Sequence, residues 1–168
     1  MALRPNNGII TKANREEFVI PTIPNPDLGP PVGSWRLLST VATFTDTGER
    51  SETFGPNPDG RMVFTSGGRI IFLIMRSNRQ SPTNDRDRAE LFDSMISYTG
   101  LVRLDGPGRF ITTVDISLIP SEVGTEKLRL FSIDGDRLVI RLPENQSRFA
   151  KGRTTVSELI WEREHQTS

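Results

Sequence analysis

Cysteine and histidine, two residue types that many enzymes use for catalysis, are nearly absent from this sequence. Its 168 residues include no cysteine and one histidine, His165, close to the C-terminus. Thiolate nucleophiles and cysteine-bound metals are therefore excluded, and serine–histidine triads or multi-histidine zinc sites have almost nothing to be built from. Any reaction would have to use carboxylate, tyrosine, hydroxyl or guanidinium groups, and we expect no metal and no cofactor.

Motifs and charge exclude further classes of function. The sequence contains no Gly-x-Gly-x-x-Gly, no phosphate-binding loop and no Gly-x-Ser-x-Gly elbow. Its 21 basic and 21 acidic residues balance, which argues against general binding of nucleic acid or acidic membranes. The start lacks the apolar run of a signal peptide, and the longest apolar stretch, 70–75, is too short to span a bilayer. We therefore expect a cytoplasmic protein that binds neither nucleic acid nor membranes.

The chain divides into an arm and one domain. Prolines recur between residues 21 and 31, and their fixed geometry predicts an extended arm over residues 1–32, followed by a single domain over 33–168. Phe18–Ile20 is an apolar segment within this arm. It would dock on the domain or on a second copy, and the latter would produce a homodimer.

From residue 33 onward, short segments rich in Val, Ile, Thr and Phe alternate with turn residues, as in an antiparallel all-β domain. Glycines in the turns 65–69, 105–108 and 134–136 favour tight hairpins. A meander of this length closes most simply into a barrel, so we predict an up-and-down antiparallel β-barrel. The expected strands are 33–46, 49–54, 60–65, 69–76, 97–105, 109–118, 126–133, 137–142 and 154–162.

One segment departs from the strand pattern. Apolar residues at 91, 92, 95 and 96 recur at helical spacing, and Thr83 or Asn84 can cap a helix N-terminus. This predicts one amphipathic helix over about 83–96. Its apolar face should cover an open end or an outer flank of the barrel.

Several motifs, in this order, resemble the lipocalin-like domain family of small bacterial and fungal proteins. They include Gly33-Ser-Trp35, the Phe54–Gly60 turn, Ser66-Gly-Gly-Arg69, Tyr98-Thr-Gly100 and Leu159–Arg163. The resemblance covers residues 33–163. It implies a lipocalin-like barrel with a helix and a cavity for a small apolar ligand. Related barrels in natural-product pathways act as cofactor-free cyclases or isomerases.

The resemblance also implies how one end of the barrel is closed. In such barrels a first-strand tryptophan plugs one end, and an arginine of the last strand lies over its ring. Here the pair would be Trp35 and Arg163, both with a structural role. We expect Trp161 to lie at the rim or on the outside.

Polar residues within the strands are the remaining candidates for chemistry. Members of the family often have a histidine in the strand that corresponds to Ile111–Asp115. This sequence has none there, so the role of that histidine would be lost or moved to Thr112, Thr113 or Asp115. In the following strand, Arg129 shares a face with Phe131, and an inward guanidinium must be paired. Asp115 is the candidate partner. Counting residues outward from a simple hairpin places Val114, not Asp115, opposite Arg129. A β-bulge would therefore be needed to bring Asp115 and Arg129 together.

The preferred hypothesis is binding of a small hydrophobic molecule in the cavity. The aromatic residues Phe64, Phe72 and Phe131 would line it. Arg76, at the end of the most apolar strand, would border the mouth or bind an anionic group of the ligand. Thr113 would offer a polar contact.

Two alternatives remain open. The first is a cofactor-independent isomerase, cyclase or dehydratase acting on a polyketide or terpenoid, in which Asp115 is the base and Tyr98 and Arg129 polarise an oxygen. The second is a structural protein that oligomerises through Phe18–Ile20.

Overall fold

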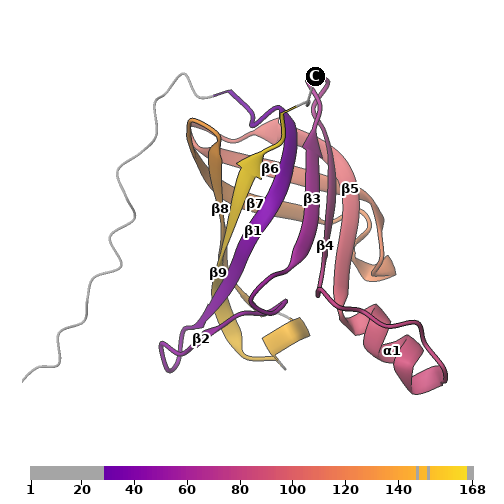
Figure 1. The fold of residues 1–168 in the computed structure, drawn as a ribbon. Coiled ribbons are helices and arrows are strands. Elements are labelled where there is room, and N and C mark those ends of the chain that lie inside the picture. Colours follow the sequence, from indigo (N-terminus) through magenta and orange to yellow (C-terminus); the bar gives the residue numbers. More distant parts are fainter. Residues whose placement is uncertain (1–28, 147, 151, 166–168) are drawn as a thin grey trace, which may run out of the picture.

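The computed structural model describes residues 29–146, 148–150 and 152–165. Within these residues, eight antiparallel strands close into a barrel, and the two-residue β2 pairs with the end of β1 (Figure 1). The strands are β1 (Gly33–Phe44), β2 (Arg50–Ser51), β3 (Asp59–Phe64), β4 (Arg69–Met75), β5 (Met95–Leu104), β6 (Arg109–Ser117), β7 (Glu126–Asp134), β8 (Arg137–Gln146) and β9 (Thr154–Arg163). The helices are α1 (Asp85–Asp93) and the 3₁₀ turns η1 (Pro120–Glu122) and η2 (Arg148–Ala150). The expected docking segment Phe18–Ile20 lies outside the described residues.

The barrel is closed by the first and last long strands. From β3 to β9 each strand pairs with the next one in sequence, and β1 pairs with both β3 and β9. The β1–β9 register runs from Trp35 opposite Arg163 to Phe44 opposite Thr155. The predicted all-β, up-and-down antiparallel barrel with one helix is therefore confirmed. The expected strand 49–54 is reduced to β2.

The two ends of the barrel differ. At one end, short hairpins join β3 to β4, β5 to β6 and β7 to β8, and glycines with positive φ such as Gly68 and Gly135 make these turns. At the other end the connections are longer and carry α1, η1 and η2 (Figure 1). The long connections are therefore gathered at one opening of the barrel.

Trp35 closes the end that has the short hairpins. Its side chain is fully buried, and its Nε1 donates a hydrogen bond of 2.8 Å to the Pro31 carbonyl. The Arg163 guanidinium lies 4.2 Å from the centre of the Trp35 ring and donates to the Val32 carbonyl. The expected cation–π pair is thus confirmed. Pro31, which we assigned to the arm, is buried with it.

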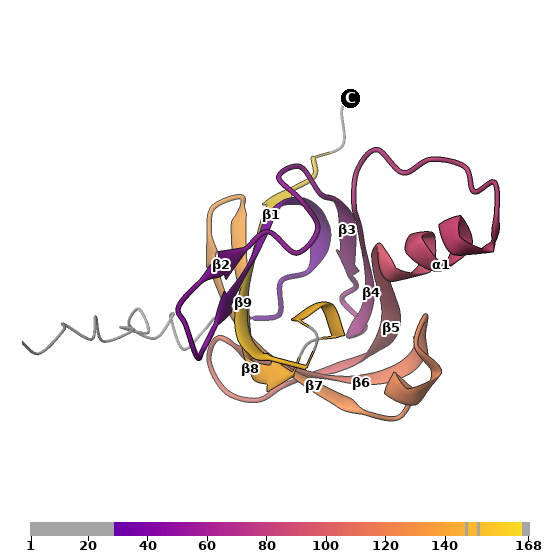
Figure 2. The ribbon, with the colours of Figure 1, turned by 90° about the horizontal axis from the view of Figure 1, so that it is seen from below.

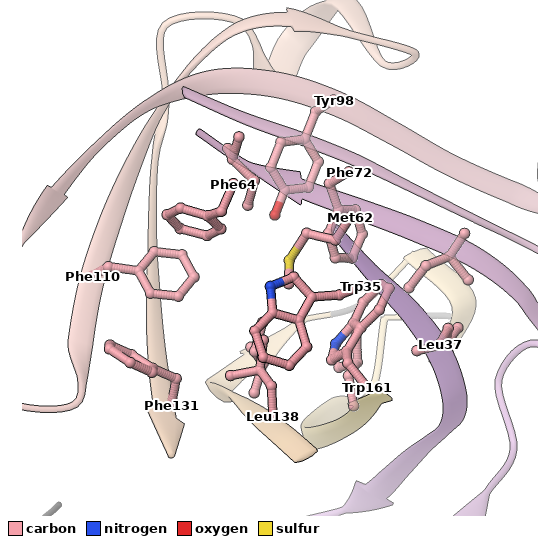
Figure 3. Close-up of a cluster of buried hydrophobic side chains, with 14 of the residues drawn as sticks. Trp35, Leu37, Met62, Phe64, Phe72, Tyr98, Phe110, Phe131, Leu138 and Trp161 are labelled. Atoms are coloured by element: carbon pink, nitrogen blue, oxygen red, sulfur yellow. The ribbon is translucent and has the colours of Figure 1, made fainter. Parts of the chain in front are cut away.

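An aromatic cluster fills the barrel next to this plug (Figure 3). Phe64 meets Phe110 edge to face at 5.3 Å, and Phe72 meets Trp161 at 5.6 Å. The prediction that Trp161 lies at the rim is wrong, because it is fully buried opposite Leu37 and Leu138. Two inward tryptophans thus fix the core at this end.

The helix is shorter than predicted and does not cover the barrel. Asn84 caps α1 by accepting a hydrogen bond from the Asp87 backbone amide, as expected for one of the two candidates. No residue of α1 is buried, and the helix stands beside the barrel opening (Figure 2). The amphipathic pattern was misleading because Met95 and Ile96 belong to β5, where they pair with β4.

A β-bulge interrupts the pairing of β5 with β6. Thr99 pairs with Ile116 and Gly100 with Val114, which leaves Asp115 without a pairing partner. A Cβ atom on Gly100 would lie 2.4 Å from the Thr113 carbonyl oxygen and 2.6 Å from the Thr112 methyl group. Only glycine allows the two strands to approach this closely.

We predict that Gly100→Ala lowers the free energy of unfolding by about 3 kcal/mol, because backbone atoms of β6 must move to admit the methyl group. Urea denaturation followed by circular dichroism measures this change. Gly67→Ala is the matched control: its Cβ meets nothing closer than 3.9 Å, so its effect stays within about 0.5 kcal/mol. Equal stability of the two variants would contradict the tight contact at the bulge.

Candidate functional site

A cavity of about 570 Å³ occupies the part of the barrel nearer the long connections. This volume lies within the usual range for small-molecule sites. Its walls are mainly apolar and come from most of the strands. The buried apolar residues that line it are Phe54, Met62, Ile70, Phe72, Ile74, Phe110, Ile140 and Leu159.

The mouth of the cavity is polar and partly covered. Its lining there includes Ser121, Glu122, Glu126, Glu144, Asn145 and Gln146. Seen along the barrel, η2 (yellow-orange) lies inside the ring of strands (Figure 2). Phe149 of η2 contacts Phe54 edge to face, with ring centres 4.9 Å apart. The cavity therefore meets solvent beside an aromatic pair, and its far end is closed by the core around Trp35.

Tyr98 brings a hydroxyl group into this apolar interior. It lies on β5, is 2% exposed and stacks on Phe72 at 4.9 Å. Its oxygen points toward the space inside the cluster (Figure 3). Burial raises the pKa of the Tyr98 hydroxyl, and the nearby positive charge of Arg129 lowers it by less. The hydroxyl is therefore neutral at physiological pH and able to donate a hydrogen bond.

Arg129 supplies a positive charge on the same side of the barrel. It lies directly opposite the buried Phe110, so its half-buried side chain faces inward, and it lines the cavity. Its Nη1 donates to the Leu128 carbonyl at 2.7 Å. Within the described part of the chain, no carboxylate forms an ion pair with Arg129. Lys127, by contrast, pairs with Glu122 at 3.0 Å.

A further polar atom lines the opposite wall. Thr40 on β1 is 5% exposed and contributes to the cavity lining. Its hydroxyl oxygen finds no hydrogen-bond partner among the described residues. A buried hydroxyl without a partner carries a desolvation cost, which a polar group of a ligand would relieve.

Three of the residues predicted for the site line the cavity: Phe72, Tyr98 and Arg129. Phe64 and Phe131 are buried as expected, but they pack on Phe110 in the core and do not reach the cavity. Alternation along a strand gives the face of a residue but not its depth along the barrel axis, which is why these two were misplaced.

The other two predicted ligand-binding residues also lie elsewhere. Arg76 is exposed and borders a separate hollow of about 140 Å³. Thr113 is exposed on the outer face of β6. Neither lines the main cavity.

Asp115 lies on the outside of the barrel, away from Arg129. Its carboxylate accepts hydrogen bonds from Thr99 and from Arg69, whose Nη1 lies 2.6 Å away. The predicted Asp115–Arg129 pair is therefore wrong. Phe110, not Val114, stands opposite Arg129, because the connection around η1 is longer than hairpin counting allowed. A bulge does occur at Asp115, but the side chain stays on the outer face of β6, as Thr113 does.

Several cavity residues were missed by the sequence analysis. Lys127 shares the inward face of β7 with Arg129, and that alternation was the available signal. Glu122 and Phe149 reach the cavity from the 3₁₀ segments η1 and η2, which carry no periodic pattern. Thr40 belongs to the long β1, where polar and apolar residues do not alternate regularly.

Other kinds of site are less well supported. In the described ranges, no group of three or more His, Asp or Glu side chains is placed to hold a metal ion. No helix among these residues has the length and apolar character needed to cross a membrane.

Residues 32–164 match a family model described as a lipocalin-like domain. The search of curated proteins found none that matches the chain.

We predict that the Asp115 carboxyl titrates below the ordinary aspartate range. The hydrogen bond from Thr99 lowers the pKa of Asp115 most, and the guanidinium of Arg69 lowers it further. Carboxyl carbon shifts measured by NMR against pH give the midpoint. The midpoint should rise in Thr99→Val and in Arg69→Gln, whereas Arg129→Gln should leave it unchanged. Sensitivity to Arg129 would instead favour the inward pairing.

Proposed function

Since this chain belongs to the lipocalin-like domain family, we propose that it binds a small hydrophobic molecule inside its barrel. The observation that carries the proposal is the cavity of about 570 Å³, walled by buried apolar side chains and open beside Phe54 and Phe149. Transfer of an apolar molecule from water into such a site is favourable in proportion to the area it buries.

The arrangement of carboxylates favours binding over catalysis. Asp115, the base in the catalytic alternative, lies on the outer face of β6, held by Arg69 and Thr99. Glu122 lines the cavity, but Lys127 neutralises it at 3.0 Å. Glu126 also borders the cavity, and its carboxylate turns to Arg103 at 3.3 Å. None of these three carboxylates is thus free to accept a proton from a bound molecule, and the remaining carboxylate of the lining, Glu144, is exposed at the mouth.

One observation supports a second candidate function. Tyr98 and Arg129 place a neutral hydroxyl and a positive charge together in an apolar cavity, where they would polarise an oxygen of a polyketide or terpenoid. A cofactor-independent isomerase or cyclase would use them in this way. Recovery of an altered product after incubation of such a compound with the protein would favour this function over simple binding.

Binding is tested with N-phenyl-1-naphthylamine, a neutral apolar dye whose fluorescence rises in dry surroundings. We expect saturable one-to-one binding to the wild-type protein. Leu142→Trp, which places an indole in the cavity wall, should weaken the affinity about tenfold or more. The matched control is Val139→Trp on the same strand, since Val139 does not line the cavity, and its affinity should stay within about twofold.

Two results would contradict the proposal. One is the absence of saturable dye binding to the folded wild-type protein. The other is equal weakening by both tryptophan variants, which would place the dye outside the cavity. Circular dichroism of each variant verifies that the barrel is intact.

A further inference from the structure

The cavity contains a positive charge that the described residues do not neutralise. Arg129 faces inward opposite Phe110, and its Nη1 donates a hydrogen bond to the carbonyl of its own neighbour, Leu128. A guanidinium carries five N–H donors, so the Leu128 carbonyl and the Tyr98 hydroxyl engage only part of them. Holding this charge in a partly dry cavity is costly unless an anion joins it.

The neighbouring charges do not supply that anion. Glu122 is paired with Lys127, and both side chains are largely buried, with 24% and 17% exposure. Glu126 is paired with Arg103, whose side chain is 54% exposed. Glu122 and Glu126 are thus engaged with other cations, and Glu144, the third carboxylate of the lining, is exposed at the mouth and forms no ion pair with Arg129. The Arg129 guanidinium therefore keeps its positive charge facing the cavity.

Tyr98 adds a second donor at the same place. It comes from β5 and Arg129 from β7, the two neighbours of β6, and the positive charge of Arg129 acts on the Tyr98 hydroxyl. The hydroxyl is 2% exposed in an apolar cluster and stays protonated. Two donor groups therefore meet at one wall of an apolar cavity, and together they suit an acceptor with negative charge.

We propose that the ligand of this cavity is an apolar acid, whose carboxylate is bound by Arg129 and Tyr98 while its hydrocarbon body lies among Phe72, Ile74 and Ile140. This inference rests on the proposed function and narrows it to a class of ligand. The planar fork of a guanidinium matches the two oxygens of a carboxylate, and charge-assisted hydrogen bonds are shorter and stronger than neutral ones. The apolar walls supply affinity for either an acid or a neutral molecule, whereas Arg129 distinguishes between them.

The test is competition against bound N-phenyl-1-naphthylamine by two ligands of equal chain length, dodecanoate and dodecan-1-ol, at pH 7.5 and below their aggregation concentrations. For the wild-type protein we expect dodecanoate to bind about tenfold or more tightly than dodecan-1-ol. Arg129→Gln should weaken dodecanoate about 10- to 100-fold and change dodecan-1-ol by no more than about twofold.

Further variants separate charge from packing. Arg129→Lys keeps the positive charge and should recover part of the affinity for dodecanoate. Tyr98→Phe should weaken dodecanoate by a smaller factor than Arg129→Gln does, because it removes one neutral donor. Arg36→Gln is the matched control, since it removes an exposed arginine that pairs with Glu162 and does not line the cavity, and it should leave both affinities unchanged.

The outcomes distinguish this inference from the proposed function. If the dye and both competitors bind but the wild-type protein does not prefer dodecanoate, the inference fails and the binding function stands. If Arg129→Gln and Arg36→Gln weaken dodecanoate equally, the effect is one of net charge and the inference also fails. If neither the dye nor a competitor binds, both fail. If Arg129→Gln does not fold, the preference of the wild-type protein for dodecanoate and the dodecanoate affinity of Arg129→Lys still test the inference.

Discussion

The hydrogen-bonded pairing of β1 with β9 is what turns a twisted sheet into an enclosed space. Each of the other long strands pairs with neighbours on both sides, and this last pairing satisfies the two edges that would otherwise face solvent. Closure with eight strands leaves an interior wide enough for side chains or one small ligand. Trp35 and Trp161 fill one end of that interior, where both side chains are fully buried. The remaining volume lies toward the long connections.

Within that volume, position around the barrel decides which chemistry is available. The aliphatic and aromatic walls come from many strands, whereas the charged and hydroxyl donors Arg129 and Tyr98 lie on the two strands flanking β6. Asp115 lies on β6 itself, but on its outer face, where Arg69 and Thr99 hold it. A ligand in the cavity would therefore meet donors without the acid that the sequence associated with them.

The sequence predicted the barrel well because alternation, turn glycines and the Gly33–Trp35 start are local signals of strands and their ends. The same alternation put Arg129 on one face of its strand with Phe131, and that face points into the barrel. Alternation fails where one residue changes the count: the bulge at Asp115 reverses the faces beyond it, so Ile116, which strict alternation would place with the buried Val114, is 67% exposed. It also could not give depth, so Phe64 and Phe131 were placed in the cavity and not in the adjoining core.

The contact between Phe54 and Phe149 affects the rates of ligand entry and release as well as the shape of the cavity mouth. Both rings line the cavity at the end where η2 lies inside the ring of strands, and they meet edge to face at 4.9 Å. A molecule that passes between these rings would have to separate them, and the energy of this aromatic pair would then add to the barrier in both directions. These two residues at the mouth would then help to set the residence time of a ligand, without having to contribute to its affinity.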